Sequence, residues 1–435
     1  MGLLGIRVIT LGCKVNQCDG DEIARALAER GYEIAANEEP ADIFIINTCT
    51  VTATADAKAR KLIRKLHREH PQARIIVTGC LAQRDPESVA LLPGVSVVVA
   101  NTEKSEIAIL VTGLWPGEAG RGGAAVQDGG ERPAGMGMPA LQGARRTRAF
   151  LKIQDGCDHH CAYCIIPKVR GRPTSKPMSK VLAEIRRLAH LGAQEVVLCG
   201  IRLGAYGRDD EEGTLAALLH ELREIEVPRL RLSSIEPMDV TEDLLAEIAD
   251  HPRLCHHLHL PLQSGDDSIL AAMGRGCTSA EYGDLVGRIR AAWPDAALTT
   301  DVMVAFPGET EEQFERTGAF VRKIGFTRVH VFSYSPRPST PAAARPDQVP
   351  AGVRRDRAAR MLAIARDLAQ AAARSWVGQR ASVLFEERGD DGRLSGLTPH
   401  YLRVRCAGPT EWIGRIVEVV PTREGRGELL ADLDQ

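Results

Sequence analysis

The stretch Ile153-Gln-Asp-Gly-Cys157-Asp-His-His-Cys161-Ala-Tyr-Cys164 places three cysteines within eight residues, directly after a predicted strand. Three thiolates on one short loop can surround a single metal centre. A structural zinc ion prefers four protein ligands, and no fourth cysteine lies nearby, although His159 and His160 keep zinc as an alternative. A [4Fe–4S] cluster with three cysteine ligands leaves one iron open. An open iron can bind S-adenosylmethionine and pass an electron into it, which generates a 5′-deoxyadenosyl radical.

Six predicted strand–helix pairs begin with the strand that precedes these cysteines. The expected strands are 149–154, 195–199, 229–235, 256–262, 298–305 and 328–334. The expected helices are 178–191, 214–225, 241–250, 266–273, 279–292 and 310–324. Six βα units are too few for a closed eightfold barrel, so the pattern predicts an open, partial (βα)6 barrel.

A second set of three cysteines lies in the N-terminal region, where no local motif joins them. Cys13, Cys49 and Cys80 each follow a predicted strand. The expected strands are Ile6–Leu11, Ile43–Ile46, Ile75–Thr78 and Val95–Val99, with helical spacing between them, which predicts a parallel sheet. Parallel strands end on the same side, so neighbouring strands would bring the three thiolates together. We therefore expect a second three-thiolate site, with three unrelated buried cysteines as the alternative.

Composition divides the chain into three expected domains. Residues 1–112 form the N-terminal α/β domain, and residues 113–143 are rich in Gly and predict a flexible linker. Residues 144–375 carry the barrel and a basic helix at about 351–374. In residues 376–435, short strand patterns and glycine turns predict a small β-barrel.

Composition also indicates the class of protein and its expected cellular location. The 435 residues are 44% hydrophobic and 26% charged, with a formal charge of −2, which indicates a globular chain without an overall basic field. No apolar run approaches the ~18 residues of a membrane helix. The N-terminus lacks the pattern of a secretion signal. The eleven cysteines therefore indicate reduced thiols or metal ligands, and we expect a cytoplasmic protein.

The chain resembles the methylthiotransferase family of radical S-adenosylmethionine enzymes, which includes the MiaB, RimO and MtaB branches. The C-x3-C-x2-C loop after the first barrel strand carries the superfamily resemblance. The segments Leu11-Gly-Cys-Lys-Val-Asn-Gln17, Asn47-Thr-Cys-Thr-Val-Thr52 and Gly200-Ile-Arg-Leu-Gly-Ala-Tyr-Gly207 are most similar to the MtaB branch. The resemblance covers nearly the whole chain apart from the linker. It implies an N-terminal cluster-binding domain, a radical S-adenosylmethionine barrel and a C-terminal TRAM domain.

The resemblance also implies the reaction and its cofactors. The MtaB branch adds a methylthio group to C2 of N6-threonylcarbamoyladenosine at position 37 of tRNA, beside the anticodon. The implied cofactors are two [4Fe–4S] clusters, one on each cysteine trio, and S-adenosylmethionine; the implied partners are tRNA, a reducing electron donor and a sulfur source, with no membrane. An aromatic C–H bond resists acid–base chemistry, which is why a radical is required. No residue is assigned as a catalytic acid or base.

Six barrel residues are implied to contact S-adenosylmethionine. They are Tyr163, Gly200, Ser234, Glu236, Gln263 and Asp301. Tyr163 matches the aromatic residue beside the adenine of this cofactor, and a core tyrosine is the alternative. A structural role in a turn is the alternative for the polar residues. Ala305 departs from the family, which usually has glycine at this position.

Local charge predicts the contact with tRNA. Residues 144–190 contain eleven Lys and Arg against three Asp and Glu, which fits phosphate binding at the mouth of the barrel. Lys168, Arg170 and Arg172 are the expected RNA-binding residues, because a solvated helix face explains the Arg170-Gly-Arg172 loop poorly. The target base must leave its stack to reach the barrel interior, as anticodon-loop bases do at low cost.

Three other functions stay open at this point. Related branches modify isopentenyladenosine in tRNA or an aspartate of a ribosomal protein, with the same two clusters. The third alternative is a non-enzymatic iron–sulfur electron carrier or scaffold, in which the barrel is only structural. Open-iron spacing in two domains argues against this third alternative.

Overall fold

A computed structural model describes residues 5–35, 39–114, 147–209 and 213–432. The described residues form two compact units, one made of residues 5–35, 39–114 and 165–171 and the other of residues 147–164, 172–209 and 213–432. Residues 113 and 114 end a helix, and the rest of the predicted linker lies outside the described residues.

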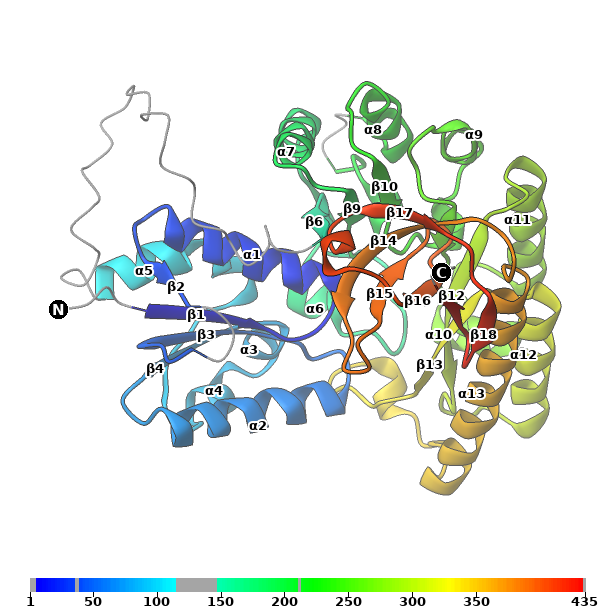
Figure 1. The fold of residues 1–435 in the computed structure, drawn as a ribbon. Coiled ribbons are helices and arrows are strands. Elements are labelled where there is room, and N and C mark those ends of the chain that lie inside the picture. Colours follow the sequence, from blue (N-terminus) through cyan, green and yellow to red (C-terminus); the bar gives the residue numbers. More distant parts are fainter. Residues whose placement is uncertain (1–4, 36–38, 115–146, 210–212, 433–435) are drawn as a thin grey trace. The chain divides into compact units, whose positions relative to one another are not determined.

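The first unit is built on a five-stranded parallel sheet with the order β2-β1-β3-β4-β5 (Figure 1). Its strands are β1 (Gly5–Thr10), β2 (Glu33–Ile34), β3 (Ile43–Thr48), β4 (Arg74–Gly79) and β5 (Val95–Val98). The expected parallel α/β fold is confirmed. The sequence did not predict β2, because a strand of two residues carries no readable alternation.

Helices cover both faces of this sheet. They are α1 (Lys14–Ala28), α2 (Ala53–Glu69), α3 (Cys80–Arg84), α4 (Pro86–Ala90), α5 (Ile107–Leu114) and α6 (Ile166–Arg170). Ile43 and Ile45 of β3 pack with α1 and α5, whereas Phe44 and Ile46 pack with α2. Side chains alternate between the two faces of a strand, so β3 must be apolar at every position of this run.

The second unit begins with the barrel. Its parallel strands form two three-stranded sheets, β10-β9-β6 and β11-β12-β13, joined by isolated bridges that include Ser234 and His259. The strands are β6 (Arg148–Lys152), β9 (Glu195–Cys199), β10 (Arg229–Leu232), β11 (His257–His259), β12 (Ala297–Val304) and β13 (Arg328–Ser333). A short hairpin, β7 (Gln154–Asp155) with β8 (Thr174–Ser175), follows β6. The expected open, partial (βα)6 barrel is confirmed.

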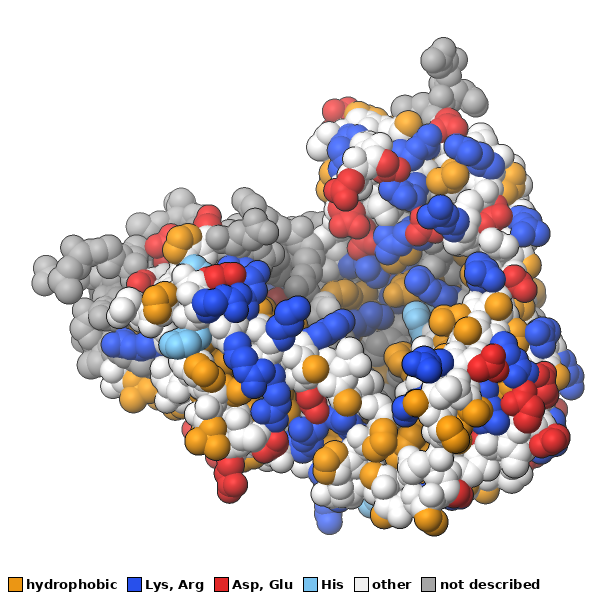
Figure 2. All heavy atoms as spheres, turned by 90° about the horizontal axis from the view of Figure 1, so that it is seen from below, with side chains coloured by type: hydrophobic (Ala, Val, Ile, Leu, Met, Phe, Trp, Pro, Cys, Tyr) orange, Lys and Arg blue, Asp and Glu red, His pale blue; other side chains and the backbone are white. Residues whose placement is uncertain are grey.

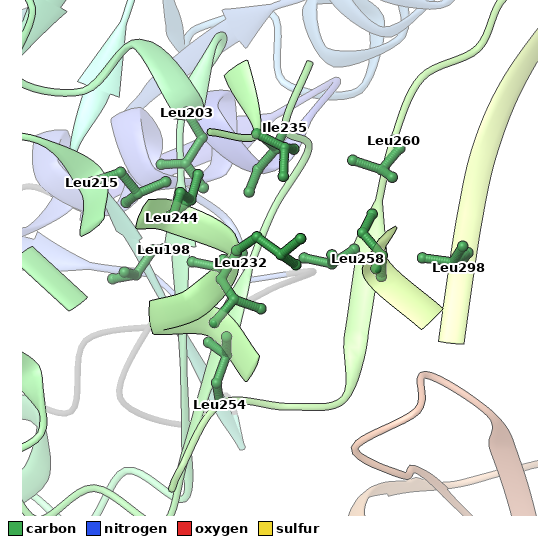
Figure 3. Packing of buried hydrophobic residues seen from close by; sticks show 14 of the residues in the cluster. Leu198, Leu203, Leu215, Leu232, Ile235, Leu244, Leu254, Leu258, Leu260 and Leu298 are labelled. Atoms are coloured by element: carbon green, nitrogen blue, oxygen red, sulfur yellow. The ribbon is translucent and has the colours of Figure 1, made fainter. Parts of the chain in front are cut away.

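Leucine-rich packing between the barrel strands and their outer helices forms the largest core. The helices are α7 (Met178–His190), α8 (Leu215–Leu222), α9 (Glu242–Asp250), α10 (Asp267–Met273), α11 (Ser279–Ala292) and α12 (Glu311–Ile324). Leu198, Leu232 and Leu258 from three strands lie with Leu215 and Leu244 from two helices (Figure 3). Among the described helices, none combines the length and the apolar character needed to cross a membrane.

The C-terminal part of this unit is a curled, mixed six-stranded sheet, a half-barrel rather than a closed barrel. Helix α13 (Ala351–Arg374) leads into strands in the order β17-β14-β15-β16-β19-β18. The strands are β14 (Ala381–Arg388), β15 (Leu394–Leu397), β16 (Arg403–Cys406), β17 (Ile416–Val419), β18 (Arg423–Gly425) and β19 (Glu428–Ala431). Phe385 is fully buried in its core, and Trp412 stacks on it at 5.8 Å between ring centroids.

Candidate functional site

The cysteines of the first unit converge at one edge of its sheet. Strand β3 lies between β1 and β4, with Asn47 opposite Thr10 on one side and Thr78 on the other. Cys13, Cys49 and Cys80 come two or three residues after Thr10, Asn47 and Thr78, respectively. All three cysteines therefore follow the carboxyl ends of neighbouring strands. The three strands are therefore neighbours in the sheet, as the prediction of a shared cysteine site required.

Two polar side chains hold the three cysteine segments together. The Asn16 amide donates to the carbonyl oxygens of Leu11 at 2.8 Å and of Thr48 at 2.9 Å, which ties the segment before Cys13 to the segment before Cys49. The Thr48 hydroxyl donates to Thr78 O at 2.6 Å and accepts from Leu81 N at 3.2 Å, which ties it to the segment around Cys80. No motif in the sequence indicated either role, since Asn16 lies in α1 and Thr48 ends β3 without any distinguishing spacing.

Glycines allow the backbone to approach closely at this edge. Gly12 has φ +113°, and a Cβ atom there would lie 2.7 Å from Cβ of Cys49. Gly79 has φ +90°, and a Cβ atom there would lie 2.5 Å from Thr48 O. Both glycines directly precede a cysteine, so the close packing of the trio depends on residues without a side chain.

Arg170 is part of this first site, which corrects its predicted role. Its side chain is 0% exposed and donates to Asn16 Oδ1 and, at 3.1 Å, to Asp19 Oδ2. A guanidinium buried in this way has no surface to offer to an RNA phosphate. Instead it lies within electrostatic reach of the thiols of Cys49 and Cys80.

Burial decides the protonation of these thiols. It raises the pKa of the Cys49 thiol, and it raises the pKa of the Cys80 thiol to about 11, although Arg170 opposes both shifts. The uncomplexed thiols are therefore protonated at neutral pH. A metal centre bound to them must expel these protons, as metal sites with thiolate ligands commonly do.

The cysteine loop of the barrel follows β6 and is held by its own polar contacts. The Gln154 amide donates to Asp155 O at 2.7 Å and to Gly156 O at 2.9 Å, and its oxygen accepts from Arg202 N at 2.8 Å. The Arg202 guanidinium also joins Asp158 at 2.7 Å and Asp239 at 2.7 Å. These contacts fix the residues on both sides of Cys157.

Arg275 connects the other end of the loop to the barrel mouth. Its guanidinium lies 3.8 Å from Sγ of Cys161, forms an ion pair with Glu236, and donates to Pro261 O at 2.9 Å. Burial opposes its charge, but Glu236, Tyr163 and Cys161 together outweigh burial and raise the pKa of Arg275. Burial also raises the pKa of the Tyr163 hydroxyl well above its usual value. The sequence offered no motif for Arg275.

The structure places the remaining predicted cofactor residues around the carboxyl ends of the strands. A Cβ atom at Gly200 would lie 3.0 Å from Gln154 Oε1, so this glycine fits against the residue that fixes the cysteine loop. Ser234 forms the bridge to β11. Gln263 has φ +73° and bonds through its backbone to Asp301 O at 2.8 Å. The Asp301 carboxylate lies 3.4 Å from His259 Nε2. Cofactor contact by these residues stays a prediction.

The other two predicted RNA-binding residues are exposed. Lys168 lies on α6 of the first unit, and Arg172 lies in the second unit. Figure 2 shows Lys and Arg side chains spread over the visible face, with acidic side chains among them. RNA binding by these two residues stays a prediction.

The donor sets fit iron–sulfur clusters better than single ions. Neither cysteine trio belongs to the described groups whose donor atoms converge within 4.8 Å, the spacing that one ion requires. In a [4Fe–4S] cluster each thiolate binds a different iron, so the three sulfur atoms need not converge on a single ion.

Two family models match this chain. A family described as uncharacterized protein family UPF0004 matches residues 5–100, and the radical SAM superfamily matches residues 151–321. A solved structure of the radical S-adenosylmethionine methyltransferase TsrM from Kitasatospora setae covers 79% of this chain and 77% of its own, with a TM-score of 0.57 and 16% identity. This likeness supports the fold alone.

Curated relatives are similar over nearly the full length. Threonylcarbamoyladenosine tRNA methylthiotransferase MtaB of Bacillus subtilis is 36% identical over 96% of this chain and 93% of its own length. The Thermotoga maritima protein of the same name is 35% identical, over 93% and 91%. The tRNA-2-methylthio-N(6)-dimethylallyladenosine synthase of Jannaschia sp. is 36% identical, over 95% and 90%. The chain therefore belongs to the radical S-adenosylmethionine methylthiotransferase family, of the MtaB and MiaB type, and is an enzyme of that kind.

Proposed function

We propose that this enzyme adds a methylthio group to C2 of N6-threonylcarbamoyladenosine at position 37 of tRNA. The observation that carries the proposal is the convergence of Cys13, Cys49 and Cys80 at one sheet edge, apart from the cysteine loop of the barrel. A methylthiotransferase must hold the sulfur atom that it transfers, and a second three-thiolate site provides a place for it. A radical methyltransferase transfers no sulfur and needs no such site. Relatives named MtaB, 35–38% identical to this chain, support the threonylcarbamoyl substrate. Relatives of similar identity named for dimethylallyladenosine make that base the alternative.

Each trio is proposed to hold one [4Fe–4S] cluster, and the barrel site also binds S-adenosylmethionine. With its cofactor bound, the barrel site supplies the radical chemistry that activates the adenine ring. Cys157, Cys161 and Cys164 are the barrel ligands. Tyr163, Gly200, Ser234, Glu236, Gln263 and Asp301 are the proposed S-adenosylmethionine contacts.

The residues of the chain position the barrel ligands and exclude water. Gln154 and Arg202 fix the loop on either side of Cys157, and Arg275 links Cys161 to Glu236. Tyr163 packs with Ile269, Met273 and Phe306, so its ring closes one side of the site with apolar contacts. A dry, rigid site of this kind keeps a reactive radical away from solvent.

The exposed Lys168 and Arg172 are proposed to bind phosphates of the anticodon loop, since each follows closely on the cysteine loop in the chain. Replacing either residue should weaken tRNA binding and reduce its salt dependence without changing the iron content.

A reaction with three tRNA substrates tests the proposed base. Anaerobically reconstituted enzyme, S-adenosylmethionine and a strong reductant are incubated with tRNA that carries the threonylcarbamoyl group, with the same tRNA lacking it, and with tRNA carrying dimethylallyladenosine. Mass spectrometry of the nucleosides should detect the methylthio product in the first sample only, and the Cys161→Ala variant should form none. If only the dimethylallyl substrate yields product, dimethylallyladenosine replaces the proposed base. If none of the three tRNAs yields product, a protein substrate is indicated.

A further inference from the structure

A group of two histidines and one aspartate lies in the second unit, away from the cysteines. Among the described residues, His256, Asp295 and His400 are the set of His, Cys, Asp and Glu side chains whose donor atoms all lie within 4.8 Å of one another. His256 Nδ1 lies 2.6 Å from Asp295 Oδ2, and His400 Nε2 lies 3.4 Å from the same oxygen. One carboxylate oxygen thus faces two imidazole nitrogens.

The three residues come from separate segments. His256 directly precedes β11, and Asp295 lies just before β12, so both stand at the amino ends of barrel strands. His400 lies in the connection between β15 and β16 of the C-terminal sheet. The group therefore joins the barrel to the half-barrel, at the end of the strands opposite the cysteine loop.

The imidazoles are held in place by aromatic packing. The ring of Trp293 lies 4.9 Å from that of His256, and the ring of Trp376 lies 4.4 Å from that of His400. The next residues along both segments, His257 and Tyr401, stack on each other at 4.5 Å. The two histidines are thus positioned by their neighbours before any ligand binds, which reduces the entropy that binding would cost.

We propose that His256, Asp295 and His400 bind a divalent first-row transition metal ion of the zinc class. Imidazole nitrogens and a carboxylate oxygen are ligands that zinc binds at about 2.0–2.2 Å, and tetrahedral geometry then sets neighbouring donors roughly 3.3 Å apart. The 3.4 Å separation of His400 and Asp295 fits this value, and the half-exposed Asp295 side chain can rotate to open the 2.6 Å contact. Three protein ligands leave the fourth position to water.

His400 gains most from such an ion. The residue is 9% exposed, and its Nε2 atom lies 3.4 Å from Asp295 Oδ2, which is long for a hydrogen bond. An ion bound to both atoms would replace this long contact with two metal–ligand bonds. It would also anchor the C-terminal sheet to the barrel, because it is bound from both sides.

Zinc binding to the reconstituted holoenzyme tests the site. The enzyme is dialysed against a small excess of zinc chloride, and zinc and iron are counted in the same sample. Wild type should hold one zinc per chain more than His256→Gln, Asp295→Asn or His400→Gln, with unchanged iron, since the site uses no cysteine. Zinc should also raise the melting temperature of wild type but not of these variants.

His220 provides a matched control, because its imidazole lies 3.5 Å from Glu247 without a second histidine. His220→Gln should bind as much zinc as wild type. His256 and Asp295 are partly exposed, so their variants remain informative if His400→Gln fails to fold. Equal zinc in wild type, His256→Gln and Asp295→Asn would overturn the proposal, as would zinc uptake that occurs only as iron is lost.

Discussion

At the residue scale, the first cysteine site depends on contacts that leave no room for a side chain. Gly79 precedes Cys80 and has φ +90°, and a Cβ atom there would lie 2.4 Å from Asn47 Oδ1 and 2.5 Å from Thr48 O. Thr48 O also accepts from Asn16, so movement here would spread to the segment before Cys13. Glycine at this position thus sets the geometry of all three ligands.

Gly79→Ala should therefore destabilise the protein and remove the first cluster. Its matched control is Gly31→Ala, because Gly31 has φ +88° and no atom within 4 Å of a Cβ position. The control should lose only the ~1 kcal/mol that a left-handed alanine costs. Gly79→Ala should lose more and bind about four fewer irons after reconstitution. Equal stability and iron content in the two variants would contradict the packing role of Gly79.

A buried histidine makes the stability of the barrel depend on pH. His251 is 5% exposed, and burial together with Arg223 lowers its pKa below its usual value. The neutral ring is thus favoured in the folded state. The stability that this neutral ring contributes is fully present above the pKa of the unfolded state, about 6.5. It is lost as the pH falls through the lower pKa of the folded state.

His251→Asn keeps an acceptor for Arg253 N, which donates to His251 Nδ1 at 3.3 Å, but removes the titrating ring. Between pH 7.5 and pH 5.5 the melting temperature of wild type should fall more than that of the variant. Other titrating groups affect both proteins equally, so the difference isolates His251. Parallel curves would show that protonation of this ring does not oppose folding.

At the scale of elements, β9 and β10 carry a buried ion pair that contacts the C-terminal sheet. Arg231 is 0% exposed and contacts both carboxylate oxygens of Glu195, at 2.7 and 3.0 Å. It also donates to Thr398 O and Pro399 O, both at 3.0 Å, in the connection between β15 and β16. Burial disfavours the ionised Glu195, but Arg231, Arg148 and Arg229 together outweigh burial and lower the pKa of this carboxyl.

Arg231→Met should cost about 3–5 kcal/mol, because it leaves the Glu195 carboxylate buried without its partner. The double variant Arg231→Met/Glu195→Leu should recover most of this loss, since it removes both charges of the pair. Urea unfolding of the reconstituted protein measures both. The partly exposed Arg223, paired with Glu247 and Asp250, provides the control, and Arg223→Met should cost much less than Arg231→Met. Equal losses in the single and double variants would show that the carbonyl contacts, not the ion pair, dominate.

At the scale of the whole molecule, the two cysteine trios belong to separate compact units. Residues 165–171, which follow Cys164 directly, are counted with the first unit and bring Arg170 to the first trio. The barrel loop and residues 165–171 are therefore consecutive in the chain but belong to different units. Loss of one ligand should spare the fold around the other trio.

Cys161→Ala should abolish formation of 5′-deoxyadenosine, because the barrel site loses a ligand. Cys49→Ala should still cleave S-adenosylmethionine under a strong reductant but yield no methylthio nucleoside. Chromatography of 5′-deoxyadenosine and mass spectrometry of tRNA nucleosides measure the two products. Methylthio product from Cys49→Ala at the wild-type level would falsify the role of the first trio, and loss of cleavage in that variant would point to one shared centre.

The sequence by itself determined the features that local pattern carries. The spacing of Cys157, Cys161 and Cys164, the strand before each of the other three cysteines, and the six βα units were all readable, because each depends on residues close together in the chain. The half-barrel was only partly predicted, since β15, β18 and β19 have three or four residues each, too few for a clear alternation.

Only the tertiary structure decided which polar side chains complete the sites. Arg170 lies 154 residues from Asn16, Arg275 lies 114 residues from Cys161, and His400 lies 105 residues from Asp295. Charge near the barrel loop suggested that Arg170 binds RNA, whereas the fold buries it beside the first trio. Sequence patterns report periodicity within one element, but burial and pairing depend on which elements meet, and that is set by the packing of the whole fold.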